Sequence, residues 1–318
     1  METFIHKYRP KYFKDFYLND DLNDLIQLLF AVNSINILLI GDSSSGKTCL
    51  LNIILREYYE LGPNERFSNE NILFVNNLKE QGIQYFRTEM KTFCQSQSTI
   101  KGKKKFVVID DIDNINDQCQ QVFRNYIDKY GNNIHFISSC TNAQKVIESL
   151  QSRLHLLKLS SINNENLKKI MHNIKENEKL QIDDESIDYL ISITNNSIHQ
   201  IVNYFEKIYI LNQPVNIELC KKICSNIYMK DFEDYIIFIK SKNLKEGIEC
   251  LQKIYNYGYS VIDILDYFFF FVKKTESLTE EQKYIIIPYL CKYITIFNNV
   301  HENKIELSLL TNNLINLL

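Results

Sequence analysis

The chain lacks several features that would place it outside the reducing interior of a cell. Its eight cysteines include no CxxC pair, which argues for free thiols and against disulfide bonds or a zinc site. The first residues, Met1–Lys7, are polar and charged and do not resemble a secretory signal. Polar residues interrupt the stretch Leu25–Gly41, and the apolar run Phe268–Phe271 is too short to cross a membrane. We therefore expect an intracellular protein without a membrane segment, and we place Phe268–Phe271 in a helical core.

A surplus of basic residues is also missing. The formal net charge is −3, so any contact with nucleic acid must come from a local surface. The one dense basic run, Lys101–Lys105, precedes an apolar segment, and we expect it to be a solvated loop rather than a DNA contact.

The length of 318 residues, 45% of them hydrophobic, suggests two or three domains with substantial cores. Up to about residue 160, apolar runs alternate with helical patterns, as a doubly wound α/β sheet requires. The expected strands are Ile35–Ile40, Ile72–Asn76, Phe106–Ile109, Ile134–Ser139 and Leu154–Leu159. Beyond residue 160 the pattern is almost wholly helical. From the change in periodicity we place domains at residues 1–160, 161–228 and 229–318.

The most informative motif fills every defined position of the phosphate-binding loop GxxxxGK[ST]. Its residues are Gly41, Asp42, Ser43, Ser44, Ser45, Gly46, Lys47 and Thr48. An expected strand precedes it and an amphipathic helical pattern follows it, which is the context that the motif requires. In such a loop the backbone N–H groups hold phosphates, Lys47 contacts the β- and γ-phosphates, and the Thr48 hydroxyl binds Mg²⁺. The sequence therefore predicts a site for a nucleoside triphosphate, the alternative being a chance glycine turn.

A pair of carboxylates follows the expected strand Phe106–Ile109. The carboxyl ends of strands are where open α/β sheets bind ligands. We expect Asp110 to bind or support Mg²⁺, and Asp111 to orient or deprotonate a water for attack on the γ-phosphate. An acidic solvated turn is the alternative, and it is less common after a phosphate-binding loop.

Motifs along the whole chain resemble those of one family, the small subunits of the replication factor C clamp loader within the AAA+ ATPases. The segments that carry the resemblance are the KYRP element Lys7–Pro10, the phosphate-binding loop, the ERGI-like Glu80–Ile83, the acidic strand end, Gln120 with Phe123 and Arg124, the SRC-like Ser152–Leu154, and Gly258–Ser260 with His301–Glu302 and Glu306–Leu307. The resemblance implies a P-loop AAA+ domain with a parallel sheet and flanking helices at residues 1–160. A helical lid domain at 161–228 and an all-helical collar domain at 229–318 would follow.

The resemblance also implies roles at the nucleotide. Tyr8, Arg9 and Pro10 would lie against adenine, and Cys49 would join the phosphate-binding loop in holding ATP. Arg153 follows an expected helix end, where its guanidinium fork can reach the γ-phosphate of a neighbouring subunit as an arginine finger. Without the resemblance, an ordinary surface ion pair would be the favoured interpretation of Arg153.

Contacts with DNA are implied by a helix that follows the ERGI-like segment. Arg87 and Lys91 are four residues apart on one face of that helix, and the resemblance adds Arg124 from a later helix. Such a basic face suits a DNA backbone that is recognised through its phosphates. Met90 and Phe93 lie on another face, for which core packing is the favoured interpretation over contact with a clamp.

Three positions depart from the family pattern. Asp111 stands where the family usually has Glu, and its side chain is one methylene shorter, which can make hydrolysis slow. Thr141 stands at the sensor 1 position in place of Asn, and it can still hydrogen-bond to a phosphate or a water. His199 stands at the sensor 2 position in place of Arg. Because His is mostly neutral at pH 7, phosphate sensing by His199 is the weakest of these roles.

The resemblance implies an ATP- and Mg²⁺-dependent subunit that works with other subunits, as a hetero-oligomer of five, on a sliding clamp and primer-template DNA. It would act in the nucleus, or at a cytoplasmic replication site if the source is a large DNA virus. Two alternatives stay open: a scaffold subunit that binds nucleotide without hydrolysis, and another DNA-acting AAA+ machine such as an initiator or a branch-migration motor. A GTPase is disfavoured, because the string nearest to NKxD, Asn303–Glu306, ends in Glu.

Overall fold

The structure is a computed structural model that describes residues 3–63, 65–75, 83–194, 196–224, 227, 229–297 and 301–317. Its residues divide into two units, Met1–Pro214 and Val215–Leu318. No helix of the described part of the chain is both long and apolar enough to cross a membrane.

A parallel five-stranded sheet forms the centre of the first unit, as the sequence predicts. Its strands are β1 (Ile37–Gly41), β2 (Ile72–Val75), β3 (Lys105–Ile109), β4 (Ile134–Cys140) and β5 (His155–Leu159), in the order β2-β3-β4-β1-β5. Every residue of β3 and β4 is buried, because helices cover both faces of the sheet. All five expected strands are confirmed, with ends that differ by one or two residues.

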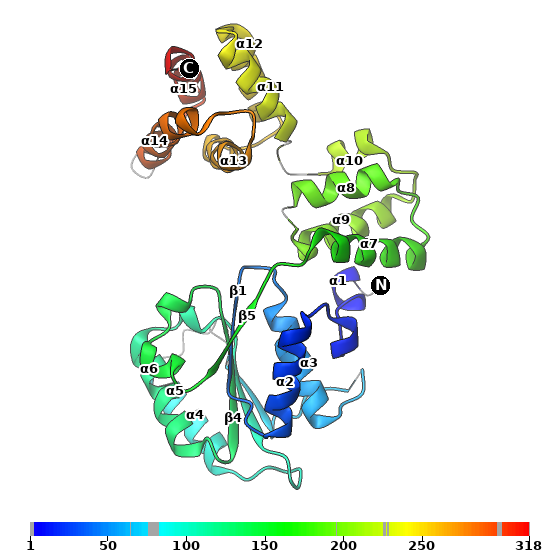
Figure 1. Ribbon diagram of the computed structural model, residues 1–318, viewed down its shortest axis with the longest axis vertical. Helices are drawn as coiled ribbons and strands as arrows, with labels where there is room; N and C mark the ends of the chain where they lie inside the picture. Colours follow the sequence, from blue (N-terminus) through cyan, green and yellow to red (C-terminus); the bar gives the residue numbers. More distant parts are fainter. Residues whose placement is uncertain are drawn as a thin grey trace. The chain divides into compact units, whose positions relative to one another are not determined.

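Helices on the two faces of the sheet build two separate cores (Figure 1). On one face lie α2 (Asp20–Ala31) and α3 (Lys47–Tyr59); on the other lie α4 (Ile83–Gln95), α5 (Asp117–Tyr130) and the short α6 (Glu148–Gln151). Met90 is buried in the second core and Phe93 packs against it, which confirms the expected core face of α4. Short elements complete this part: η1 (Phe13–Asp15), η2 (Ile112–Asn114) and η3 (Ala143–Lys145).

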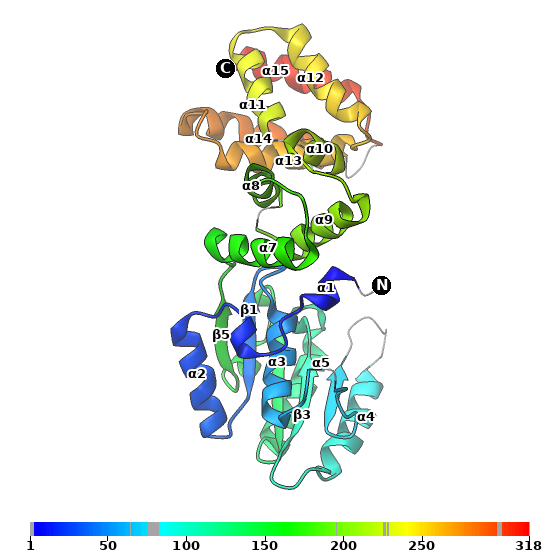
Figure 2. The ribbon, with the colours of Figure 1, turned by 90° about the vertical axis from the view of Figure 1, so that its right-hand side faces the viewer.

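Three further helices belong to the first unit: α7 (Asn164–Glu178), α8 (Asp184–Ile193) and α9 (Ile198–Leu211). The short N-terminal helix α1 (Phe4–Lys7) packs against α9 rather than on the sheet (Figure 2). The buried ring of Phe4 lies 5.2 Å from the ring of Tyr209, measured between centroids. The first residues of the chain thus pack on its later helices, which neither periodicity nor composition indicates.

The second unit is all-helical and has its own core. Its helices are α10 (Ile217–Ile223), α11 (Met229–Lys240), α12 (Leu244–Asn256), α13 (Val261–Lys274), α14 (Glu280–Ile296) and α15 (Ile305–Leu317). Capping boxes start α13 at Ser260 and α14 at Thr279, which satisfies N–H groups that the first helical turn leaves unpaired. Phe268 and Phe271 are buried in this core, so the expected place of the Phe268–Phe271 run in a helical core is confirmed.

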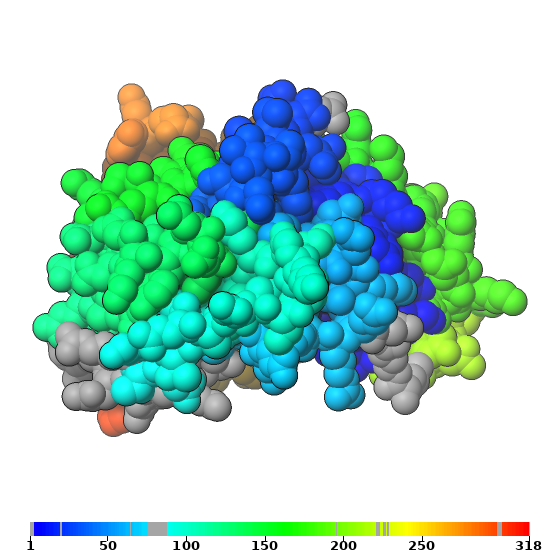
Figure 3. All heavy atoms as spheres, turned by 90° about the horizontal axis from the view of Figure 1, so that it is seen from below, coloured from blue at the N-terminus to red at the C-terminus, as the bar shows by residue number. Residues whose placement is uncertain are grey.

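The basic run before β3 is not a simple solvated loop, which corrects the prediction from sequence. Lys103 donates to the carbonyl of Tyr58 at 2.7 Å, and Lys104 donates to the carbonyl of Asn33 at 3.2 Å. Lys105 is buried, and its ammonium donates to the Phe93 carbonyl at 2.9 Å, near the C-terminus of α4. The surfaces of residues 90–105 and of α2 adjoin on this side of the unit (Figure 3). Carbonyl groups at the C-terminal ends of helices attract cations. Lys103, Lys104 and Lys105 therefore stabilise the fold through these contacts.

A buried histidine in β4 makes the stability of the first unit dependent on pH. His135 accepts a hydrogen bond from the Ile35 N–H at Nδ1, 3.3 Å away, and its Nε2 lies 3.1 Å from Asn33 Oδ1. Rings of Tyr58 and Phe106 pack beside it. Burial, with a smaller effect of Lys104, lowers the pKa of His135 to about 3. The folded unit therefore holds this imidazole neutral at any pH above that value.

We expect His135 to make the folded state lose stability as the pH falls below about 6.5, the ordinary pKa of an unfolded histidine. The unfolded chain then binds a proton that the folded chain excludes. Between pH 7 and pH 5 the loss is about 2 kcal/mol in the free energy of unfolding. Urea unfolding at both values should show a smaller loss for His135→Gln than for the parent, with the exposed His155→Gln as the control. Equal losses in all three proteins would contradict the prediction.

Candidate nucleotide-binding site

The loop between β1 and α3 has the backbone geometry of a phosphate cradle. Gly46 has φ of 90° at the N-cap of α3, and a Cβ there would lie 2.8 Å from the Phe16 ring. Only glycine satisfies both constraints. Ser44 also adopts a positive φ of 67°, so the loop curls back before the 13-residue helix begins. The free N–H groups of the first turn of α3 therefore face the loop.

Lys47 is buried and closes this loop on itself. Its ammonium donates to the carbonyls of Gly41 and Asp42, at 2.9 Å each. The Ser45 hydroxyl is buried and has no hydrogen-bond partner among the described residues. An ammonium beside an unpaired hydroxyl, at a helix N-terminus, fits the negative charge and the acceptor oxygens of phosphate groups.

The carboxylate of Asp110 joins three segments at the same edge of the sheet. The Thr48 hydroxyl donates to Asp110 Oδ2 at 2.8 Å, and the Ser139 hydroxyl at the end of β4 donates to Oδ1. The Asp111 N–H donates in turn to Ser139 Oγ at 3.0 Å. A hydroxyl and a carboxylate at this spacing are a donor pair for Mg²⁺, which typically takes one or two protein oxygens together with phosphate oxygens. Among the described residues no cluster of His, Cys, Asp and Glu could hold a metal by itself.

Asp111 is half-buried beside the predicted phosphate position. Its backbone is left-handed, with φ of 52°, a conformation that is uncommon outside glycine. Burial, and next the charge of Asp110, raise the pKa of the Asp111 carboxyl, while Lys47 opposes this shift. A carboxylate with a raised pKa accepts a proton more readily than an ordinary aspartate, as a base acting on water requires.

A third carboxylate, Asp113, orients the residue at the sensor 1 position. Asp113 Oδ2 accepts from the Thr141 N–H at 3.1 Å, from the Thr141 hydroxyl at 2.6 Å and from the Asn142 N–H at 3.0 Å. The hydroxyl proton of Thr141 is thereby engaged, so Oγ1 offers lone pairs toward the site. Such an oxygen can accept a hydrogen bond from water. No sequence motif marks Asp113 by itself; its place in the run Asp110–Asp113 is the available signal.

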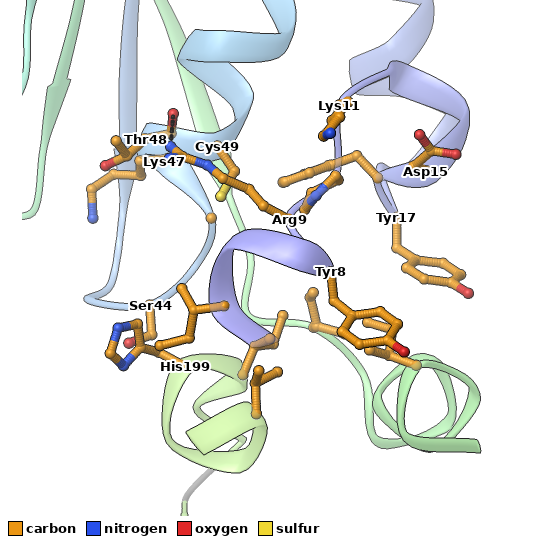
Figure 4. Close-up of a pocket in the computed structure, with 18 of the residues that line it drawn as sticks. Tyr8, Arg9, Lys11, Asp15, Tyr17, Ser44, Lys47, Thr48, Cys49 and His199 are labelled. Atoms are coloured by element: carbon orange, nitrogen blue, oxygen red, sulfur yellow. Dashed lines mark hydrogen bonds between the residues drawn. The ribbon is translucent and has the colours of Figure 1, made fainter. Parts of the chain in front are cut away.

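One cavity of about 1020 Å³ brings most of the predicted nucleotide-binding residues together (Figure 4). Predicted residues that line it are Tyr8, Arg9, Pro10, Ser43, Ser44, Gly46, Lys47, Thr48, Cys49, Asp111, Thr141 and His199. The cavity lies between the phosphate-binding loop, the segment after α1, and helices α7 and α9. Apolar side chains from α7 and α9, among them Ile174 and Val202, form part of its wall. This volume is in the upper range of small-molecule sites and suits a nucleotide.

The segment after α1 links the phosphate-binding loop to α7. Lys7 Nζ and the Tyr8 hydroxyl both donate to Glu178 Oε1, at 2.5 and 2.6 Å, and Arg9 Nη2 donates to the Thr48 carbonyl at 3.4 Å. Lys7 and then Tyr8 lower the pKa of the Glu178 carboxyl, which is nearly buried. The sequence does not indicate this role of Glu178, because a glutamate at a helix end has no local signature of it.

Helix α9 reaches the phosphate-binding loop through its N-cap. The Ser197 hydroxyl donates to Ser44 Oγ at 3.2 Å. His199, in the first turn of α9, is exposed and lines the cavity, and its Nδ1 lies 3.4 Å from Asn203 Nδ2. Figure 4 shows His199 beside Ser44. The predicted contact of His199 with a phosphate therefore stays a prediction. Ser197, at the N-cap of α9, is a further residue of this helix that contacts the phosphate-binding loop.

The predicted arginine finger and DNA contacts lie elsewhere in the first unit. Arg153 is not among the residues that line the cavity, and its Nε donates to Asp128 Oδ1 at 2.5 Å. Lys91 is exposed on α4, and Arg124 lies on α5, which packs against α4. Arg87 belongs to α4, but its side chain lies outside the described residues, as do residues 80–82 of the ERGI-like segment.

The first unit has the architecture of a P-loop nucleotide-binding protein of the AAA type. It combines a parallel sheet with a phosphate-binding loop after β1, acidic residues after β3, and helices α7–α9 beside the cavity. Residues 33–167 match the family model of an AAA domain, and residues 227–306 match that of the replication factor C C-terminal domain. The chain thus carries an AAA domain followed by a C-terminal domain of the replication factor C type.

Proteins named as replication factor C subunits match this chain along most of their own length. Replication factor C subunit 4 of Schizosaccharomyces pombe is 27% identical over 87% of this chain and 80% of its own. Replication factor C subunit 2 of Arabidopsis thaliana is 26% identical over 86% and 81%. A protein of Acanthamoeba polyphaga mimivirus, named as a replication factor C small subunit, is 24% identical over 96% and 90%.

Among solved structures, the Holliday junction branch migration motor RuvB of Thermotoga maritima is similar to this chain. It has a TM-score of 0.54 and 14% identity, over 77% of this chain and 85% of its own. At this identity the likeness shows a common fold.

Lys47→Ala should abolish nucleotide binding, because it removes the cation that neutralises the β- and γ-phosphate charge. Titration of the purified chain with a fluorescent ATP analogue and Mg²⁺ measures this. Lys101→Ala, which removes an exposed lysine distant in sequence from the loop, is the control and should bind as the parent does. Unchanged affinity of Lys47→Ala would contradict the assignment of the loop.

Proposed function

We propose that this chain is an ATP-driven subunit of a clamp loader that, with partner subunits, opens a ring-shaped sliding clamp and places it on primer-template DNA. The observation that carries the proposal is the presence of two matches on one chain: an AAA domain with an assembled phosphate site, and a replication factor C C-terminal domain. The names of the relatives describe subunits, which supports a multi-subunit complex, proposed here to be a pentamer. The eukaryotic and viral relatives favour a nuclear or viral site of replication.

ATP with Mg²⁺ is the proposed cofactor. The N–H groups at the start of α3, the Lys47 ammonium and the Ser45 hydroxyl would hold its phosphates. Thr48 and Asp110 would hold Mg²⁺, which would supply charge neutralisation at the β- and γ-phosphates. Tyr8, Arg9, Pro10 and Cys49 would face the rest of the nucleotide, in the cavity that they line. This part of the proposal is supported by the unpaired Ser45 hydroxyl and by the cations at the loop.

Hydrolysis would use Asp111 and Thr141 as acceptors for the attacking water. The raised pKa of Asp111 suits a base, and the bond from Thr141 to Asp113 leaves lone pairs for the water. Arg153 would act on the nucleotide of a neighbouring subunit, since it does not line the cavity of its own chain. Its alternative role, a surface ion pair, is compatible with its contact to Asp128, and mutation of Arg153 separates the two.

DNA would bind along α4 and α5 through Arg87, Lys91 and Arg124. Lys91 is exposed, and the two helices pack side by side on one face of the sheet. A branch-migration motor remains the rival among DNA-acting machines, because the RuvB fold is similar. The match of residues 227–306 to a replication factor C domain favours the clamp loader.

If Asp111 is the base and its side chain is one methylene too short, Asp111→Glu should raise ATP turnover in the complex of co-expressed subunits. Asp111→Asn should lower this turnover by at least about tenfold. ATP binding should persist in both variants, because neither change removes a phosphate-binding group. Steady-state phosphate release with clamp and primed DNA, together with nucleotide titration, gives the two quantities. The same turnover in all three proteins would favour the scaffold subunit that binds ATP without hydrolysing it.

Replacing both Arg87 and Lys91 with Ala should weaken binding to primed DNA to the same degree for different sequences. The slope of log affinity against log salt should become shallower by about one unit per lost phosphate contact. Fluorescence anisotropy of the assembled complex between 50 and 200 mM salt, about the range where such contacts act, measures both. Lys168→Ala, on α7, is the matched control. An unchanged slope would mean that this face of α4 points away from DNA.

A further inference from the structure

Two arginines of the first unit share one carboxylate, that of Asp128 in the last turn of α5. Arg153 Nε donates to Asp128 Oδ1 at 2.5 Å, and Arg153 Nη1 donates to the Ser149 carbonyl at 2.6 Å. Arg124, one helical turn before Asp128, has its Nε 3.7 Å from Asp128 Oδ2. The predicted finger and a predicted DNA contact are thus connected through a single side chain.

The two arginines are held to different degrees. Two nitrogens of Arg153 are anchored, on Asp128 and on the Ser149 carbonyl, which leaves the planar guanidinium few orientations. Its Nη2 has no hydrogen-bond partner among the described residues. Arg124 Nε is buried and also makes no hydrogen bond in this part of the chain, because 3.7 Å is too long for one. Arg153 is therefore oriented by Asp128, whereas Arg124 is only attracted to it.

The charges of this group favour a phosphate at Arg124. Two guanidinium groups and one carboxylate leave a net charge of about +1, and the side chain of Arg124 is partly exposed, at 37%. A phosphate that pairs with Arg124 would draw it away from Asp128. The carboxylate would then have Arg153 as its sole cationic partner, and the orientation of Arg153 would become better defined.

We propose that Asp128 is a positioning residue that orients Arg153 and makes this orientation respond to a DNA phosphate bound at Arg124. The inference rests on the proposed function, and it deepens that function by naming the side chain through which DNA acts on hydrolysis in a neighbouring subunit. The Arg124, Asp128 and Arg153 side chains, all partly exposed, form a surface group outside the two cores.

The test is Asp128→Asn in the complex of co-expressed subunits. The ratio of ATP turnover with primed DNA to turnover without it should fall by about fivefold, the change that corresponds to the upper range of an exposed ion pair. Asp128→Glu keeps the charge and should retain most of the ratio. ATP affinity of this chain should stay the same, because Asp128 does not line its cavity. Asp188→Asn breaks another exposed ion pair, that with Lys168, and is the matched control.

Two results would overturn the inference. One is an unchanged ratio in Asp128→Asn while Arg153→Ala lowers DNA-stimulated turnover, which leaves the finger and the proposed function intact but removes Asp128 from them. The other is an equal fall of turnover with and without DNA, which would make Asp128 a support of Arg153 that does not respond to DNA. If Arg153→Ala itself has no effect, the proposed finger fails first, and the inference fails with it.

Discussion

The carboxylate of Asp110, which accepts hydrogen bonds from Thr48 and Ser139, is the interaction on which the arrangement of the site depends. Parallel strands bring their carboxyl ends to one edge of the sheet, but this alone does not set the distances between the loops that follow them. Asp110 sets these distances, because it joins the first turn of α3, the end of β3 and the end of β4. Asp111 and Thr141 then take their places relative to the phosphate-binding loop from segments already held together.

A second set of contacts closes the site from the opposite side. Lys7 and Tyr8 bind Glu178 at the end of α7, Arg9 contacts the phosphate-binding helix, and Ser197 contacts Ser44. Each of these contacts joins segments that are far apart in the sequence. Nucleotide that enters the cavity would touch both groups of segments, so binding energy at the phosphates can change the position of α7–α9.

Electrostatics divides the acidic residues of the run Asp110–Asp113 into different roles. Three hydrogen bonds from Thr141 and Asn142 favour the ionised form of Asp113, and its pKa is lowered despite burial. For Asp111, burial and next the charge of Asp110 raise the pKa of the carboxyl, and the opposing charge of Lys47 does not cancel these effects. Asp111 and Asp113 are only two residues apart, yet their surroundings shift the pKa values of their carboxyl groups in opposite directions.

The sequence by itself determined the class of the fold and the position of the phosphate site, because both are encoded locally. Buried parallel strands read as continuous apolar runs, and a phosphate-binding loop needs particular residues at fixed spacing. Only the tertiary structure decided the partners of polar side chains. Lys7 and Glu178 are 171 residues apart, Asp128 and Arg153 are 25 apart, and Lys105 is buried within a run that looks solvated. A local pattern records the period of an element and the chemistry of its side chains, but a hydrogen bond between two elements depends on how the whole chain packs.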